Sequence, residues 1–171
     1  MVDQLLLNNL TKNANSFAAR WKAMVRKAHQ LKHYNTMDDQ TLIEKNAPLY
    51  PVIAKLLDRG LDTTRLGTFC VKHAKAQLHE GYPLSEIIYS LNLSEKVLID
   101  YITSEYAPEN HVKMYMSIGA MARISEVFLL ASFYITKGYL EEVYTNLLAG
   151  EGASEELLKK YLNDDFFFKQ T

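Results

Sequence analysis

The chain has 171 residues, of which 48% are hydrophobic and 23% are charged. This composition is typical of one globular domain that is large enough to bury a core. The 19 basic and 20 acidic residues leave a formal net charge of -1, and no strongly basic segment stands out. A nucleic-acid partner therefore has no electrostatic support from the composition.

The sequence predicts a cytoplasmic protein that does not insert into a membrane. The first residues, MVDQLLLNNL, place Asp3 where a signal peptide would carry positive charge. The longest apolar stretch, VFLLASFYI at 127–135, has about half the length needed to cross a bilayer. Cys70 is the only cysteine, so no internal disulfide is possible, and a single thiol is typical of a reducing compartment.

The first element that we expect is an amphipathic helix over residues 4–31. Apolar side chains recur in steps of three and four, as a helix of 3.6 residues per turn requires. They are Leu7, Leu10, Ala14, Phe17, Trp21, Met24, Val25 and Ala28. Asp3 would cap this helix, and the polar stretch KHYNTMDDQ that follows it is predicted to be a loop.

Proline, glycine and aspartate mark the next helix boundaries. A helical pattern from about Thr41 is interrupted by prolines, and we expect Pro51 to open a new helix at its first position. Gly60 would close that helix and Asp62 would cap the next one. In the segment HAKAQLHEGYPLSEIIYSL, Gly81 stands where a helix C-terminus takes a left-handed residue, so a corner is predicted there.

The second half of the chain predicts two long helices. One carries apolar residues from Leu84 to Ile102, and another extends from Pro108 to about Leu148, a length of about 40 residues. A shorter helix is expected at 154–161, before the tail NDDFFFKQT. Because sustained period-two alternation is absent, the predicted fold is all-α, with one helical domain over 1–150 and a short helix and tail over 151–171.

The histidines do not form an obvious metal site. His73 and His79 are six residues apart, which places them well over 90° from each other around one helix. His29 and His33, four apart, could share a face, but no third ligand lies near them in the sequence. We therefore expect no metal or other cofactor, and we interpret His73 as a hydrogen-bonded residue of the core.

No catalytic motif is present either. Cys70 shares its helical stripe with Leu66 and Phe69, which is typical of a small buried hydrophobic residue. The sequence has no glycine-rich phosphate loop and no GxSxG turn. Nothing in it supports an assignment as an enzyme.

Three segments resemble the N-terminal domain of the RsbR and RsbRD family of stressosome proteins, the RsbT co-antagonists. The corner HAKAQLHEGYPLSEIIYSLNLSEKVLIDYI matches the family's pattern of a polar turn, glycine and a leucine-rich helix. The first helix, LTKNANSFAARWKAMVRKA, carries a tryptophan in its second half, and ISEVFLLASFYITKGYLEEVY resembles the family's long last helix.

The resemblance implies a globin-like helical fold without haem, which acts as a non-catalytic sensory or protein-interaction module and is commonly a homodimer. Such a module usually precedes a STAS or other output domain. The residues after Leu148 are too few to form one. A role in a bacterial signalling or stress-response pathway, with an unidentified regulatory partner protein, is the function that the resemblance implies.

The apolar run in the long helix independently suggests self-association. Between Val127 and Ile135 only Ser132 is strongly polar, and a helix that is apolar all round must be buried all round. One side would pack in the core, through Met121, Ile124, Phe128, Ala131 and Ile135. The other side, with Val127, Leu130 and Tyr134, would contact either more core or a second subunit, and we predict a dimer interface there.

Two alternative functions depend on His73. In a histidine phosphotransfer domain an exposed histidine accepts a phosphoryl group, and FCVKHAKAQLHEG partly matches that motif, although Ala76 stands where a lysine is expected. In a haem-binding globin-type sensor, His73 would face a pocket for the porphyrin.

Trp21 is expected to be among the most buried residues, packed near Phe69 and Phe128.

Overall fold

A computed structural model describes residues 4–60, 62–106 and 111–149, and all the regular structure in these ranges is helical. The α-helices are α1 (Gln4–Lys12), α2 (Ala14–Lys27), α3 (Lys32–Asn35), α4 (Asp39–Asn46), α5 (Leu49–Arg59), α6 (Thr63–His79), α7 (Leu84–Tyr101) and α8 (His111–Leu148). A π-helical turn, η1 (Ile102–Tyr106), extends α7. The predicted all-α fold with a long C-terminal helix is confirmed.

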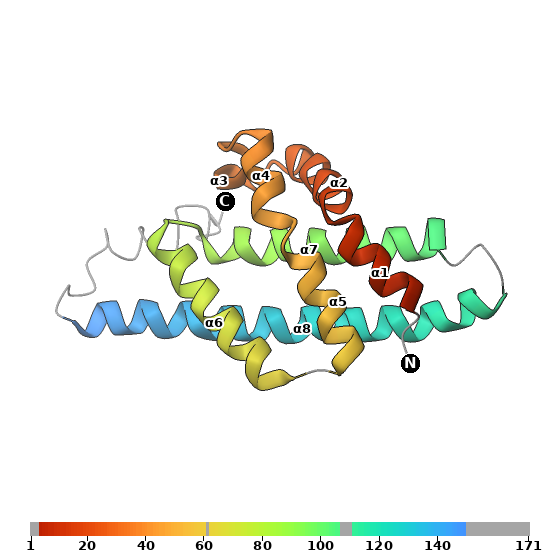
Figure 1. Cartoon of the computed structure of the whole chain (residues 1–171). Coiled ribbons are helices and arrows are strands. Elements are labelled where there is room, and N and C mark those ends of the chain that lie inside the picture. Colours follow the sequence, from red (N-terminus) through yellow and green to blue (C-terminus); the bar gives the residue numbers. More distant parts are fainter. Residues whose placement is uncertain (1–3, 61, 107–110, 150–171) are drawn as a thin grey trace, which may run out of the picture.

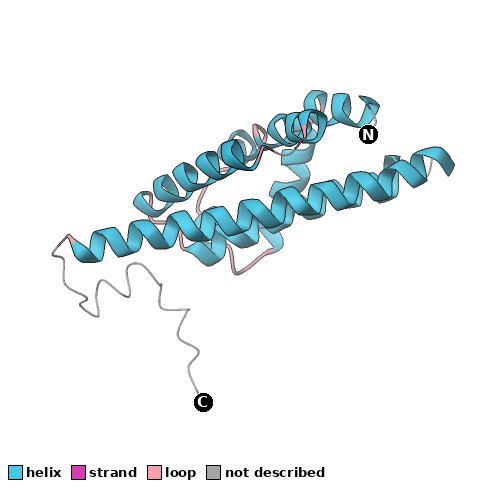
Figure 2. Ribbon diagram, turned by 90° about the horizontal axis from the view of Figure 1, so that it is seen from below, coloured by secondary structure: helices cyan, strands magenta, loops and turns pink. Residues whose placement is uncertain are grey.

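The helices pack around α7 and α8, which lie side by side along the length of the molecule (Figure 1). α6 crosses α8 and makes the most extensive contact in the fold, while α2 packs on α7 and α1 packs on α5. Figure 2 shows α8 as a nearly straight rod that extends from one end of the molecule to the other. The buried side chains of all these helices form one continuous core.

The predicted helix over 4–31 is in fact two helices. The chain bends at Asn13, although its amide still donates to the Asn9 carbonyl and its carbonyl accepts from Phe17. The second helix ends early because the Asn35 side-chain amide donates to the carbonyls of Val25 and Ala28, which caps the helix from outside. The turn after Ala28 then directs Leu31, which is fully buried, into the core.

The segment predicted as a loop after this helix contains α3 and the start of α4. Asp38 caps α4, because its carboxylate accepts hydrogen bonds from the backbone and hydroxyl of Thr41. These hydrogen bonds lower the pKa of Asp38. The helix that was expected from about Thr41 therefore begins two residues earlier, at Asp39.

The proline prediction was wrong in one detail. Pro48, with helical backbone angles, stands at the N-cap position of α5, and Pro51 is the third residue of that helix. A proline is tolerated there because the first four amides of a helix have no intrahelical acceptor. The predicted ends of the neighbouring helices are confirmed: Gly60 follows α5 with a φ of 85°, and the Asp62 carboxylate accepts from the Arg65 amide to cap α6.

The corner at Gly81 is a helix C-terminus of the Schellman type. Gly81 has a φ of 85°, its amide donates to the Leu78 carbonyl, and the Tyr82 amide donates to the Gln77 carbonyl. Pro83 then stands at the N-cap position of α7, which begins at Leu84. The corner is therefore a backbone device that sets the direction of α7.

The long last helix is described from His111 to Leu148, 38 residues. Asp3, Pro108 and the predicted helix at 154–161 lie outside the described residues. By length and composition alone α8 could cross a membrane, but a central helix of a packed bundle meets the same criterion. In this fold α8 packs against α5, α6, α7 and η1.

Two glycines let α6 and α8 approach closely. A Cβ on Gly138 of α8 would lie 2.8 Å from the Val71 Cα on α6, and one on Gly67 would lie 3.0 Å from the Tyr134 ring. Contacts shorter than about 3 Å do not occur between such atoms, so the crossing requires a residue without a side chain at Gly138. This crossing fixes which side of α8 faces the core.

Candidate functional site

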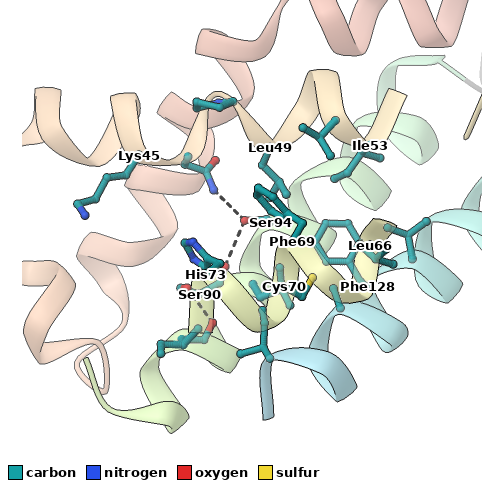
Figure 3. A pocket seen from close by; sticks show the side chains of 18 of the residues that line it. Lys45, Leu49, Ile53, Leu66, Phe69, Cys70, His73, Ser90, Ser94 and Phe128 are labelled. Atoms are coloured by element: carbon teal, nitrogen blue, oxygen red, sulfur yellow. Dashed lines mark hydrogen bonds between the residues drawn. The ribbon is translucent and has the colours of Figure 1, made fainter. Parts of the chain in front are cut away.

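A cavity of about 320 Å³ lies between α4, α5, α6, α7 and α8. Figure 3 shows its lining side chains. Most of them are apolar, and they include Leu49, Val52, Ile53, Leu56, Leu66, Phe69, Cys70, Leu91, Phe128, Ala131 and Ile135. The volume is at the lower end of the range for small-molecule sites.

The antiparallel arrangement of α5 and α6 sorts the lining by polarity. The chain descends through α4 and α5 and returns through α6, so residues near 45 lie opposite residues near 75 (Figure 1). Lys45, Asn46, His73 and Gln77 consequently line one end of the cavity, whereas Leu56 and Leu66 line the other. In Figure 3, Lys45 and His73 lie on one side, and Leu66 and Phe128 lie on the opposite side.

A buried hydrogen-bond network forms one wall at the polar end. The Asn46 amide donates to the Ser94 hydroxyl at 2.9 Å, and Ser94 donates to the Ser90 carbonyl. The same carbonyl accepts the indole N–H of Trp21 at 2.8 Å, and the Ser90 and Tyr34 hydroxyls are 3.0 Å apart. Trp21 is 2% exposed, so the prediction that it is deeply buried is confirmed.

Two polar atoms near this network lack partners. Among the described residues, the Asn46 side-chain oxygen and the Tyr50 hydroxyl are buried without a hydrogen bond. An unpaired buried acceptor or donor costs about 1–3 kcal/mol relative to a paired one. Groups of this kind are uncommon in the core of a folded protein.

His73 lies at the rim of the cavity and not in the core interior, so the sequence interpretation needs correction. Its imidazole is exposed to solvent on one side and stacks on the Phe69 ring, with ring centres 6.2 Å apart. The surrounding protein desolvates the imidazole and Lys45 adds positive charge, and both lower the pKa of His73. Phe69 is itself 56% exposed, so it does not pack in the core beside Trp21 as expected.

Two charged groups act on the pKa of His73: Lys45 lowers it and Glu80 raises it. The Lys45 ammonium is 3.4 Å from the Glu80 carboxylate and also lies over the Tyr82 ring. Both side chains of this pair are about half exposed, so the pair is weak. Gln77 donates to Glu80 from the cavity side.

Cys70 is buried and lines the cavity wall, as its position on the apolar stripe predicted. Burial raises the pKa of its thiol to about 11, so the thiol is protonated at neutral pH. The geometry therefore gives Cys70 a packing role.

The other histidines lie apart from the cavity. His79 contacts Glu142 at 3.0 Å, and the same carboxylate contacts Lys75. The His33 ring packs against Tyr82, and its backbone amide donates to the buried Glu86. Within residues 4–60, 62–106 and 111–149, no three His, Cys, Asp or Glu side chains come together in a way that could hold a metal ion.

Of the three residues proposed for a dimer interface, Val127 is buried, whereas Leu130 and Tyr134 are only partly buried. Val127 is 5% exposed and lines the cavity, and Leu130 and Tyr134 pack against the core, with the Tyr134 ring against Gly67 of α6. This placement removes Val127 from the predicted interface and leaves Leu130 and Tyr134 partly exposed on the flank of α8. It follows from the close α6–α8 crossing, which covers part of that flank.

A different face of α8 exposes large apolar side chains. Its exposed members are Tyr115, Leu129, Phe133, Leu140 and Tyr144, and we call this set the outer face. Leu129 is 72% exposed and Phe133 is 59% exposed. Two charged residues, Glu126 and Lys137, are exposed on the same face, because positions three or four apart share one side of a helix.

Sequence patterns could not identify the cavity's polar end, because Lys45, Asn46 and Ser94 lie on separate helices. The outer face gave no clear signal either, because the run from 127 to 135 is apolar on nearly every side of the helix. Comparison with protein-family models, curated proteins and solved structures found no match.

Proposed function

We propose that this protein is a non-enzymatic sensory and protein-interaction module that forms a homodimer through the outer face of α8. The resemblance to the RsbR and RsbRD sensory domains supports this proposal, and with it a globin-like fold, a cytoplasmic location and a role in bacterial signalling or stress response. A regulatory partner protein would then respond to the arrangement of the paired helices.

The single observation that carries the proposal is the exposure of Leu129 and Phe133 at the middle of α8. Burying a side chain of this size stabilises a protein by about 1.5–3 kcal/mol, so two copies of each offer a large driving force for association. The polar residues that a solvent-facing stripe normally carries are few here, and Leu140 and Tyr144 extend the apolar surface by three turns.

The charges on the outer face favour a second copy of the chain as the occupant. In an antiparallel pair with its two-fold axis between residues 131 and 132, Glu126 would face the partner's Lys137. Phe133 would face the partner's Leu130 in the centre. Lys137 makes an ion pair with Glu141 at 3.8 Å, which is exposed and weak, so it would exchange readily for a contact across the dimer.

Signal transmission through such a dimer needs no catalytic residue. α8 contributes Phe128, Ala131 and Ile135 to the cavity wall on one side and Leu129 and Phe133 to the outer face on the other. A partner or ligand that binds one arrangement of the helices more tightly would increase its population. The output would be the geometry of the helix pair.

A charge swap tests the antiparallel pairing. Glu126→Lys and Lys137→Glu should each weaken the dimer, because each places like charges opposite one another across the two-fold axis. The double variant should restore dimerisation, and Lys72→Glu, at an exposed position on α6, is the control. Single variants that dimerise like the wild type, or a protein that partitions into lipid vesicles through α8 instead of dimerising, would overturn the proposal.

Phosphotransfer is the alternative that the exposed position of His73 favours. Its sequence context does not match, because Ala76 stands where the motif has a lysine, and the neighbouring Lys75 is paired with Glu142. Incubation with acetyl phosphate and mass spectrometry tests it: an acid-labile phosphoryl group on His73 would replace the present proposal. The haem-sensor alternative also uses His73, and a porphyrin absorption band in the purified protein would establish it.

A further inference from the structure

We propose that the cavity between α4, α5, α6, α7 and α8 is a binding site for a small carboxylic acid with an apolar body of about ten carbon atoms. The acid group would lie at the end lined by Lys45, His73 and Gln77, and the body would extend toward Leu56 and Leu66. This inference does not rest on dimerisation, because the cavity belongs to a single chain.

The volume sets the size of the ligand. A cavity of about 150 Å³ holds benzene, with six carbon atoms, so 320 Å³ accommodates about twice that number of non-hydrogen atoms. A porphyrin has several times as many atoms as benzene. A chain of eight to twelve atoms, roughly the size that this scaling gives, is the better match.

The lining sets the polarity of the ligand body. From Leu49 to Leu56 on α5 and from Leu66 to Cys70 on α6, the residues that line the cavity are apolar apart from the thiol, which is protonated. Phe128 and Ala131 of α8 close this end. A hydrocarbon body would bury most of its surface there without leaving a polar group unpaired.

The head group is set by the donors at the other end. Lys45 carries a full positive charge, the His73 ring can bind a proton, and Gln77 supplies a side-chain amide. Glu80 is the opposing charge, and it already contacts Lys45 through an exposed, weak ion pair and Gln77 through a long hydrogen bond of 3.4 Å. A ligand carboxylate would compete with Glu80 for Lys45 and would favour the protonated form of His73, whose pKa is lowered in the free protein.

The unpartnered Asn46 oxygen does not contribute to binding of the acid group. Asn46 is 7% exposed and lines the cavity, yet its oxygen accepts no hydrogen bond among the described residues. An ionised carboxylate also only accepts hydrogen bonds, so it would not pair with this oxygen. The head-group contact is therefore assigned to Lys45, His73 and Gln77 alone.

Trp21 makes the test direct, because it is the only tryptophan and it lines the cavity. Sodium decanoate, titrated below its micelle concentration, should change Trp21 fluorescence with a saturable, one-to-one isotherm, and should do so more strongly as the pH falls toward the pKa of His73. 1-Decanol has the same body and no charge, so it should bind at least about tenfold more weakly, the value of one charge-assisted hydrogen bond.

The double variant Lys45→Gln, His73→Gln should remove the preference for decanoate over decanol, because it removes both basic side chains from the head-group end. Both side chains are at the rim, so their loss leaves the core intact. Lys72→Gln, on the same helix as His73 and outside this cavity, is the control and should bind decanoate like the wild type. A cavity-filling variant, Ala131→Leu, should abolish binding of both probes. Three results would overturn the proposal: a titration that does not saturate, decanol that binds as tightly as decanoate, or a Lys45→Gln, His73→Gln variant that binds decanoate like the wild type. None of these results depends on the oligomeric state.

Discussion

Gly138→Ala tests whether the α6–α8 crossing requires a glycine. The added Cβ would lie 2.8 Å from the Val71 Cα and 3.0 Å from the Val71 carbonyl oxygen, so the two backbones have to separate. Overpacking of this kind costs about 1–3 kcal/mol, and the better helix propensity of alanine returns about 1 kcal/mol. The expected result is a net destabilisation of up to about 2 kcal/mol.

Gly119→Ala is the matched control, because it lies in the same helix and its added Cβ meets no atom within 4 Å. Only the propensity gain applies, so this variant should be more stable than the wild type by up to about 1 kcal/mol. Urea unfolding followed by circular dichroism gives both values. The two variants should differ by about 1–3 kcal/mol, and equal stabilities would refute the close backbone contact.

Two further substitutions test the core. Trp21→Ala should lower the free energy of unfolding in urea by about 3–5 kcal/mol, because it removes a large buried ring and the hydrogen bond to the Ser90 carbonyl. Free quenching of Trp21 fluorescence by iodide in the native protein would contradict this placement. Burial raises the pKa of Glu86 above its ordinary value of 4.5, so ionisation opposes folding. The stabilising effect of Glu86→Gln should therefore be small below pH 4.5 and should grow as the pH rises through the raised pKa. If the difference in free energy of unfolding between variant and wild type did not change with pH, the pKa of Glu86 would not be raised.

The sequence predicted the corners of the fold well, because each depends on a local signal. Asp62 caps its helix through its own side chain, and Gly60 and Gly81 adopt backbone angles that other residues rarely reach. The end of α2 was missed because Asn35, eight residues beyond it, caps it through a tertiary contact. No periodicity within 4–31 encodes that contact.

The candidate site was harder to predict for a physical reason. α8 is apolar on nearly every side between 127 and 135, so the pattern does not show which side faces the core. The side is set by the contact of Gly138 with α6, which assigns Val127 to the core and Phe133 to the solvent. The cavity is likewise created by the meeting of five helices, and no single segment describes it.

Sedimentation equilibrium of the wild type and of Phe133→Glu is the most direct test of the proposed dimer. The wild type should sediment as a dimer at micromolar concentration, and the variant should be a monomer with unchanged helix content, because the new carboxylate would be buried without a partner at the two-fold axis. Phe69→Glu is the control, since Phe69 is nearly as exposed as Phe133, 56% against 59%, but lies on α6. A monomeric wild type, or a dimer that Phe133→Glu leaves intact, would contradict association through the outer face of α8.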